Sequence, residues 1–410
     1  MSFIADPIGF IITWLRALLT GWGLAPGAVE LIMDSLGVVV ICALGLGFTI
    51  FLIWVERKIS ARFQGRLGPN RVGPYGLLQT FADIVKIFTK EHITPRGVDV
   101  IVFNIAPVLS VSAVLLLWAI IPFASTVVGT EINVGILYIV AVGSLGTLAI
   151  LIAGWSSNNK FALLGAFRSV AQMVSYEVPM VLALLVVTIL TRSMSITAIV
   201  NAQDVWFALV SPLAFLLFLI SSQAEMGRAP FDLMEAESEL VAGYQTEYSG
   251  LKFGMFFVGE FLHSFTVGAL VATIFLGGWR GPWADQYPVL GFFYFFIKAF
   301  FIYFVTLWLR FSLPRLRIDH MLNFNWKFLV PLGLVLVVVT ALVDKILFTL
   351  SPDINLWLRA GVQFAVNVLL FVIANAMVQA NFRRRPLRQP VAAPKPVARP
   401  AESSPVTENA

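Results

Sequence analysis

Long apolar runs constrain this chain more than any other feature. Nine are long enough to cross a bilayer, at about residues 30–55, 101–122, 135–155, 161–190, 205–222, 254–277, 290–311, 328–350 and 357–380. Only 12% of the residues are charged, whereas a water-soluble domain carries about a quarter. Within lipid, only helices and closed barrels satisfy all backbone polar groups, and these runs do not alternate as barrel strands do. We therefore expect an all-α polytopic membrane protein of about nine transmembrane helices.

Basic residues predict the orientation. They gather after the first run, after the seventh run and in the C-terminal tail. The positive-inside rule then places the N-terminus outside and the C-terminus in the cytoplasm. We expect an N-terminal interfacial segment over 1–29, a membrane domain of eight spans over 30–350, an additional ninth span over 351–382 and a disordered Pro-rich cytoplasmic tail over 383–410.

Two shorter segments predict amphipathic interfacial helices. One is Ile8 to Leu19, which is too short to span and contains Arg16. The other follows the first run, with an apolar face that includes Leu77 and Phe81 and a polar face that includes Lys86. Such a helix lies flat at the membrane surface. It anchors lipid headgroups, or it forms a gate through which an amphipathic ligand slides from the bilayer.

Cysteine and histidine usage excludes several kinds of chemistry. Cys42 is the only cysteine, which rules out cysteine-ligated iron–sulfur clusters. Of the histidines, His92, His263 and His320, only His263 lies in an apolar run, so a haem held by two histidines in the bilayer is implausible. The net charge of +5 arises from basic residues at the ends of runs, so it indicates no nucleic-acid partner. We expect no metal, flavin or iron–sulfur cluster in this chain.

One cytoplasmic connection is acidic where the others are basic. Between the fifth and sixth runs, acids greatly outnumber the two bases, Arg228 and Lys252; the acids are Glu225, Asp232, Glu235, Glu237, Glu239 and Glu247. Asp232 followed by Glu235 resembles a capping box, which predicts a helix beginning near Phe231. The segment is a solvated acidic helix, or a partly buried cluster of carboxylates that share protons.

Several ionisable residues lie within the apolar runs, namely Glu177, Glu260, His263 and Lys298. Each costs about 2.5–3.5 kcal/mol at mid-bilayer on insertion scales, and such residues tend to mark ion or proton paths. The alternative is a structural ion pair that joins Glu177 or Glu260 to Lys298.

Two long motifs resemble a known family. The first runs Glu56-Arg57-Lys58, Gln64, Arg66, Gly68-Pro69-Asn70 and Val72 to Gly76, and the second runs Ala224-Glu225, Arg228, Pro230-Phe231-Asp232 and Glu235 to Gly250. In this order they closely resemble the H subunit of proton-pumping NADH:quinone oxidoreductase, respiratory complex I. Ser175-Tyr176-Glu177 and Pro314-Arg315-Leu316-Arg317 also match. The resemblance covers about residues 35–350.

The resemblance implies a subunit of a translocase in a bacterial-type inner membrane, with no catalytic residue of its own. Its partners would be the hydrophilic-arm iron–sulfur subunits, the other membrane-arm subunits, membrane lipids and quinone, which is the substrate. It would form the membrane end of the quinone chamber, and the residues implied at quinone access and in the chamber are Arg57, Arg66, Phe231, Asp232, Arg310 and Arg315. The implied proton path comprises Glu177, Glu225, Glu235, Glu237, Glu239, Glu247 and Glu260.

Three alternative functions remain compatible with the sequence. The chain could be the equivalent subunit of a complex-I-like oxidoreductase or membrane-bound hydrogenase. It could also be a stand-alone cation/proton antiporter that uses Glu177 and Glu260, or a purely structural anchor for a soluble enzyme.

Overall fold

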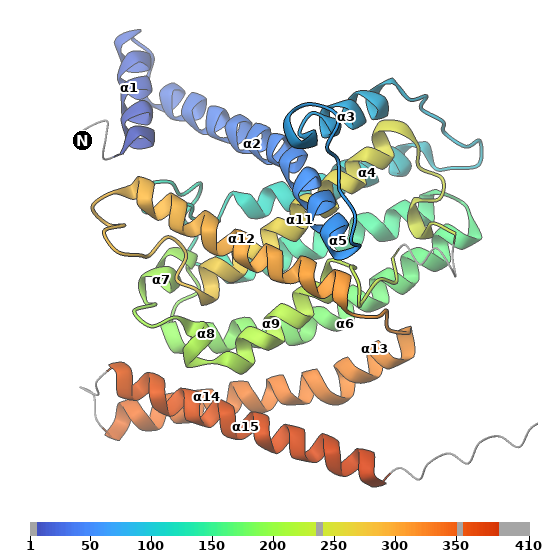
Figure 1. Ribbon diagram of the computed structural model, residues 1–410. Helices are drawn as coiled ribbons and strands as arrows, with labels where there is room; N and C mark the ends of the chain where they lie inside the picture. The colour runs from blue at the N-terminus through green and yellow to red at the C-terminus, as the bar shows by residue number, and fades with distance from the viewer. Residues whose placement is uncertain (1–5, 235–240, 351–355, 385–410) are drawn as a thin grey trace, which may run out of the picture. The chain divides into compact units, whose positions relative to one another are not determined.

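Every regular element is helical in residues 6–234, 241–350 and 356–384, the part of the chain that the computed structural model describes (Figure 1). Within this part, eight helical segments are long and apolar enough to cross a membrane. They are α2 (Pro26–Phe63), α4 (Val100–Trp118), α5 (Gly135–Ser156), α6 (Lys160–Thr191), α11 (Gly250–Phe275), α12 (Pro288–Ser312), the run from α13 (Ile318–Phe324) through η3 (Asn325–Leu329) to α14 (Val330–Leu350), and α15 (Leu356–Arg384). The expected all-α polytopic fold is confirmed, while the orientation of the termini stays a prediction.

The fifth apolar run is divided rather than continuous. Ser211 leaves the helical conformation, with a φ of −132°, between α8 (Phe207–Val210) and α9 (Pro212–Glu225). Pro212 has no backbone N–H to donate, so it starts a new helix instead of continuing the old one. At 14 residues, α9 is about 21 Å long, which is shorter than the hydrocarbon core of about 30 Å. For this reason eight segments of the described chain, and not nine, meet the length of a span.

Both predicted short helices are present. Helix α1 (Pro7–Gly21) begins at Asp6, whose side chain accepts a 2.9 Å hydrogen bond from the backbone N–H of Gly9. Helix α3 (Gln79–Thr89) carries the predicted amphipathic pattern. Their placement at the membrane surface stays a prediction. The short helix α7 (Ile196–Asn201) has no counterpart among the predicted elements.

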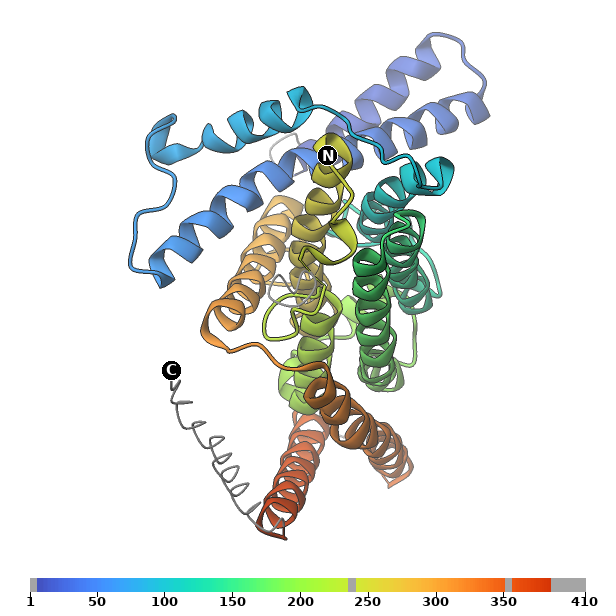
Figure 2. The same cartoon turned by 90° about the vertical axis from the view of Figure 1, so that its right-hand side faces the viewer.

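The chain divides into two compact units, residues 1–368 and 369–410, and the candidate site lies in the first. In that unit α4, α5, α6, α9 and α11 form a ring in which each helix contacts the next (Figures 1 and 2). Helix α12 packs on the outside of α11, and α2 contacts both. Of the second unit, residues 369–384 are helical.

Prolines inside two spans open the helices to tertiary contacts. A proline cannot donate to the carbonyl four residues earlier, so Pro107 leaves the Phe103 carbonyl without its helical partner. The Tyr248 hydroxyl donates to that carbonyl at 3.2 Å, and the two rings stack with centroids 4.0 Å apart. Burial raises the pKa of Tyr248 to about 12, so its hydroxyl remains a donor at physiological pH.

The second proline works in the same way. Pro179 in α6 leaves the Ser175 carbonyl free, and the Asn325 Nδ2 donates to it at 2.6 Å. The neighbouring Tyr176 hydroxyl donates to the Met321 carbonyl at 3.0 Å. Each proline therefore creates an acceptor to which a distant segment of the chain binds.

The predicted helix beginning near Phe231 is not observed, because residues 231–234 are irregular. Tertiary hydrogen bonds bind backbone carbonyls in and before this stretch. Gln172 Nε2 donates to the carbonyls of Ala224 and Phe231 at 2.6 and 2.7 Å, and the Leu316 N–H donates to the Pro230 carbonyl at 2.9 Å. Residues 235–240 and 385–410 lie outside the described residues, and with them the predicted carboxylate helix beyond Met234 and most of the predicted tail.

We expect Tyr248→Phe to lower the melting temperature of the purified protein, because it leaves a buried carbonyl unsatisfied, at a cost of about 1–3 kcal/mol. The same substitution in a Pro107→Ala background should lower it less, since the backbone N–H of an alanine would restore the helical donor to the Phe103 carbonyl. Thermal unfolding of the four variants, followed by differential scanning fluorimetry, measures the difference. Equal losses in both backgrounds would show that Pro107 does not create the need for Tyr248.

Candidate functional site

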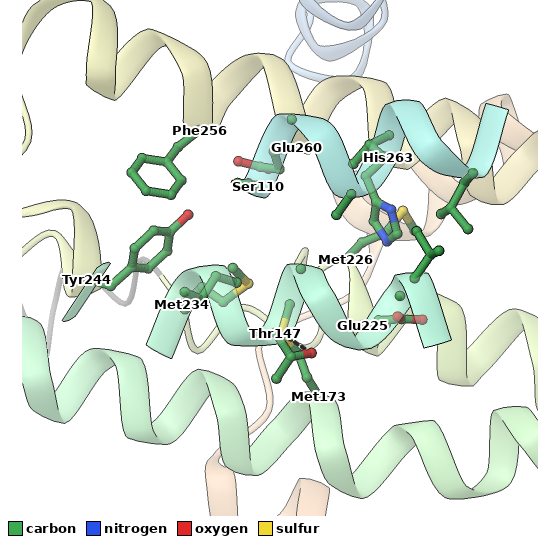
Figure 3. A pocket seen from close by; sticks show the side chains of 18 residues that line it. Ser110, Thr147, Met173, Glu225, Met226, Met234, Tyr244, Phe256, Glu260 and His263 are labelled. Atoms are coloured by element: carbon green, nitrogen blue, oxygen red, sulfur yellow. Dashed lines mark hydrogen bonds between the residues drawn. The ribbon is translucent and has the colours of Figure 1, made fainter. Parts of the chain in front are cut away.

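A mostly apolar cavity of about 70 Å³, with a few ionisable groups in its lining, lies inside the ring of five helices. Figure 3 shows Glu260 and His263 of α11 on one side of it, and Glu225 at the end of α9 on the other. The rest of the lining is mostly apolar and includes Met173 of α6 and Tyr244. Two carboxylates and an imidazole thus face one small space between membrane helices, where each needs a partner or a shared proton.

Glu225 reaches the cavity because Gly143 of α5, which has no side chain, leaves room beside it. A Cβ atom on Gly143 would lie 3.2 Å from the Glu225 Oε1, so any larger residue would press on the carboxylate. Glu177 of α6 is near enough to Glu225 to interact with it electrostatically. When both carboxylates are ionised they repel, so the protonation of one depends on the charge of the other.

A chain of ion pairs leads from the cavity toward the loops. Arg228, whose side chain is only 3% exposed, donates from Nε to Glu260 at 2.9 Å and from Nη1 to Glu56 at 2.8 Å. Glu56, at the end of α2, also pairs with Arg310 of α12 and accepts from the Tyr303 hydroxyl at 3.4 Å. Two arginines and two carboxylates from four segments therefore form one continuous network.

Arg228 is held charged by this network. Burial alone would lower the pKa of its guanidinium, but the carboxylates of Glu56 and Glu260 raise it above the ordinary value. The guanidinium carbon also lies 5.0 Å from the ring centroid of Phe261, within the range of a cation–π contact. Arg228 therefore acts as a fixed positive charge rather than as a group that exchanges protons.

Glu260 lies between two cavities. It lines the cavity with Glu225 and His263, and it also lines a second cavity of about 40 Å³ with Arg228, Asp232 and Arg310. Buried Nη2 of Arg228 makes no hydrogen bond within the described part of the chain. A space of this size has room for water. Glu260 is thus the carboxylate that the linings of the two cavities share.

The residues implied at quinone access and in the chamber occupy four separate places. Arg57, paired with Asp83 of α3, and Arg66, which donates to Gln64 at 2.7 Å, line an open basin of about 720 Å³ with Arg71. In the second cavity lie Asp232 and Arg310, whereas Phe231 lines an apolar hollow of about 410 Å³ and contacts the ring of Tyr176 at 5.3 Å. Arg315 lies in the segment between α12 and α13.

The implied proton-path residues are likewise only partly brought together. Glu225 and Glu260 share a cavity, and Glu177 lies close to Glu225. Glu247 lies elsewhere and accepts a 2.6 Å hydrogen bond from Asn159, the residue that caps α6. Glu235, Glu237 and Glu239 lie outside the described residues.

The predicted structural pair between Glu177 or Glu260 and Lys298 is wrong. Lys298 Nζ instead donates to three backbone carbonyls, those of Leu276, Gly278 and Arg280, at 2.8–3.0 Å. These lie just beyond the end of α11, where carbonyls lack helical donors and attract a cation. Glu260 takes Arg228 as its partner.

Sequence reasoning gave no site role to Glu56 or Arg228. Glu56 looked like part of a charged cluster at the membrane edge, and Arg228 like one of two bases in an acidic connection. Their position in the sequence could have indicated a role. Each is a charged residue within two helical turns of the end of an apolar run, where a buried charge requires a partner.

The fold and the site define a polytopic membrane protein with a buried network of carboxylates and arginines. The profile of the NADH dehydrogenase family matches residues 36–341. The chain is 49% identical over 325 residues, 78% of its length and 90% of the relative's, to the H subunit of the NADH-quinone oxidoreductase of Dehalococcoides mccartyi strain CBDB1. It is 43% identical to that of Phocaeicola vulgatus over 350 residues, 82% and 98% of the two chains. It is 44% identical to the H subunit of Carboxydothermus hydrogenoformans over 328 residues, which cover 80% of this chain and 93% of the relative.

The chain therefore belongs to the NADH dehydrogenase family, and the resemblance carried by the two sequence motifs is confirmed. The match ends before α15, which lies beyond the part shared with the family profile.

We expect Arg228→Gln to destabilise the protein by at most about 3–5 kcal/mol, because it removes a buried guanidinium and leaves the partly buried Glu260 without its ion-pair partner. Arg57→Gln, which breaks a half-exposed pair with Asp83, should cost at most about 1 kcal/mol. The double variant Arg228→Gln/Glu260→Gln should recover part of the loss. Melting temperatures and yields from detergent-solubilised membranes measure all three, and equal behaviour of the two arginine variants would contradict the structural importance of Arg228.

Proposed function

We propose that this chain is the H-type membrane subunit of an NADH–quinone oxidoreductase in a bacterial-type inner membrane. In this role it forms the membrane end of the quinone chamber and couples quinone reduction to proton translocation. Its family membership and the names of its relatives support the enzyme class. The observation that carries the coupling role is that Glu260, held by Arg228, faces two cavities at once.

The proposal assigns electron transfer to partner subunits. A single cysteine cannot ligate an iron–sulfur cluster, so the two electrons that reduce the quinone come from a cluster in the hydrophilic arm. Reduction to quinol also takes up two protons. This chain supplies the membrane wall and the charged side chains that respond when those protons are withdrawn.

In the proposal, the ion-pair network responds to quinone reduction by a change in the protonation of its carboxylates. Arg310 and Asp232 line the cavity on the loop side of Glu260. A negative charge that develops near these groups draws the arginines toward it and weakens their hold on the carboxylates. Glu260 then binds a proton more readily, and the change reaches Glu225 through the shared cavity and Glu177 through electrostatic coupling. Glu177 in turn acts on membrane-arm subunits that conduct protons.

Arg57 and Arg66 have a separate part in the proposal. Their open basin borders the amphipathic helix α3, where a quinone could pass from the bilayer. They steer the quinone headgroup, or they receive acidic residues of the hydrophilic arm.

Purification of the affinity-tagged chain from its native membrane tests the enzyme class. We expect co-purification with flavin- and iron–sulfur-containing subunits, and NADH oxidation that depends on added quinone. Hydrogen evolution without NADH oxidation would instead establish the hydrogenase-type relative. Cation/proton exchange by the purified chain alone in liposomes would establish the antiporter.

Neutral substitutions test the coupling role. We expect Glu225→Gln and Glu177→Gln to assemble normally but to reduce coupled NADH:quinone turnover and proton pumping several-fold, because an amide cannot bind the proton. Glu131→Gln is the matched control, since Glu131 is exposed in the connection between α4 and α5. Pumping is followed with a pH-sensitive dye in inverted vesicles, and wild-type pumping by both variants would refute the proton role.

A further inference from the structure

A hollow of about 370 Å³ lies at the other end of the helices from the basic loops. Its lining comes from the end of α6, from the connection between α7 and α8, from α8, from the end of α14 and from the start of α15. Residues 1–368 contain all of the lining, so the hollow belongs to one compact unit. It is remote from the ion-pair network and shares no residue with the cavities of the proposed quinone and proton site.

The hollow has more positive than negative charge. Asp344 of α14 is a buried carboxylate that does not itself line the hollow, and Arg359 donates to its Oδ1 from Nε at 2.9 Å. Arg192 approaches the other oxygen from Nη2 at 3.6 Å. Both arginines line the hollow. Two guanidinium groups therefore share one carboxylate, and an excess positive charge faces the space.

The position of these arginines is unusual for a membrane protein. Lys and Arg at span ends normally mark the cytoplasmic side, yet Arg192 and Arg359 lie at the opposite ends of their spans from the basic loops. Arg192 also adopts a left-handed backbone conformation, with φ +55°, at the end of α6. A residue other than glycine costs energy there, so neither topology nor backbone preference explains why an arginine occupies the position.

A buried polar atom in the lining has no partner in the described chain. Gln363 is 1% exposed, its Nε2 donates weakly to the Thr340 carbonyl at 3.5 Å, and its Oε1 accepts no hydrogen bond from any described residue. An unpaired buried carbonyl of this kind costs about 1–3 kcal/mol. A ligand with a hydroxyl donor would remove that cost.

Apolar side chains border the charged lining. Phe348 and Leu356 line the hollow and are exposed, and the Arg192 guanidinium carbon lies 4.4 Å from the Phe348 ring centroid. Helix α14 ends and α15 begins here, so the hollow lies at the depth of lipid headgroups, with hydrocarbon alongside. The lining therefore suits an amphipathic ligand with an anionic polar end.

We propose that this hollow binds the headgroup of an anionic phospholipid with a hydroxylated headgroup, of the phosphatidylglycerol type. The phosphate binds Arg192 and Arg359, a headgroup hydroxyl donates to Gln363 Oε1, and the acyl chains lie along Phe348 and Leu356. The volume is at the low end of the range for small-molecule sites, so it admits a headgroup and leaves the acyl chains in the bilayer. Because α15 follows the segment that the family profile matches, the lipid would join this added helix to the shared core.

Photo-crosslinking of the intact complex in nanodiscs tests the proposal without a mutation. Phosphatidylglycerol with a diazirine near its headgroup should label the peptides that contain Arg192, Phe348 or Leu356, and the matching phosphatidylcholine probe should label them several-fold less. Equal labelling by the two probes would overturn the proposal. Suppression of the labelling by inorganic phosphate alone would identify free phosphate as the ligand instead.

Variants supply a second measurement. We expect Arg192→Gln, and Gln363→Leu independently, to reduce the labelling several-fold, while Arg359 keeps Asp344 paired in both. Arg280→Gln is the matched control, because Arg280 pairs with Asp204 at 2.8 Å on the same side of the protein and does not line the hollow. Retained labelling in Arg192→Gln, or an equal loss in Arg280→Gln, would count against a specific site. NADH:quinone turnover measured in parallel separates this outcome from a failure of the proposed enzyme function.

Discussion

The buried guanidinium of Arg228 is the constraint on which the rest of the site depends. A charge removed from water is tolerated only when opposite charges and hydrogen bonds compensate it. Here Glu56 comes from the end of α2, Glu260 from the middle of α11, and Arg228 from the connection after α9. The two pairs together hold the three segments in one register. That register also brings Glu260 to the boundary between the two cavities.

Interrupted backbone hydrogen bonding holds the loops on the bundle. In lipid, a carbonyl freed by proline has no water to turn to and must find a donor in the protein. Pro107 and Pro179 provide such carbonyls, and Tyr248 and Asn325 bind them. The acidic connection gains its irregular course from the same principle, since Gln172 binds two of its carbonyls. Rigid anchoring of this kind keeps the charged groups at defined distances, which electrostatic coupling between them requires.

The sequence predicts many of the residues that form the site, but not how these residues are arranged in space. The sequence predicts Glu177 and Glu260 because ionisable groups within apolar runs are costly, and Glu225 because it belongs to the acidic connection and to the second family motif. Glu225 and Glu260 share a cavity. The alternative in which Glu260 pairs with Lys298 is wrong, because Lys298 donates hydrogen bonds to carbonyls beyond the end of α11. The helix start expected near Phe231 is not observed, since tertiary hydrogen bonds hold Pro230 and Phe231 in an irregular segment, while the predicted helix beyond Met234 lies outside the described residues.

The sequence by itself determined the membrane class, the number and bounds of the apolar runs, and the family, because hydropathy and motifs are local properties that can be counted along the chain. Only the tertiary structure decided that Arg228 joins two carboxylates, and that Arg192 and Arg359 share Asp344. The physical reason is the same in both cases. A buried charge requires a partner, and the sequence shows the requirement, but segments up to 172 residues apart in the chain must pack before the identity of the partner is known.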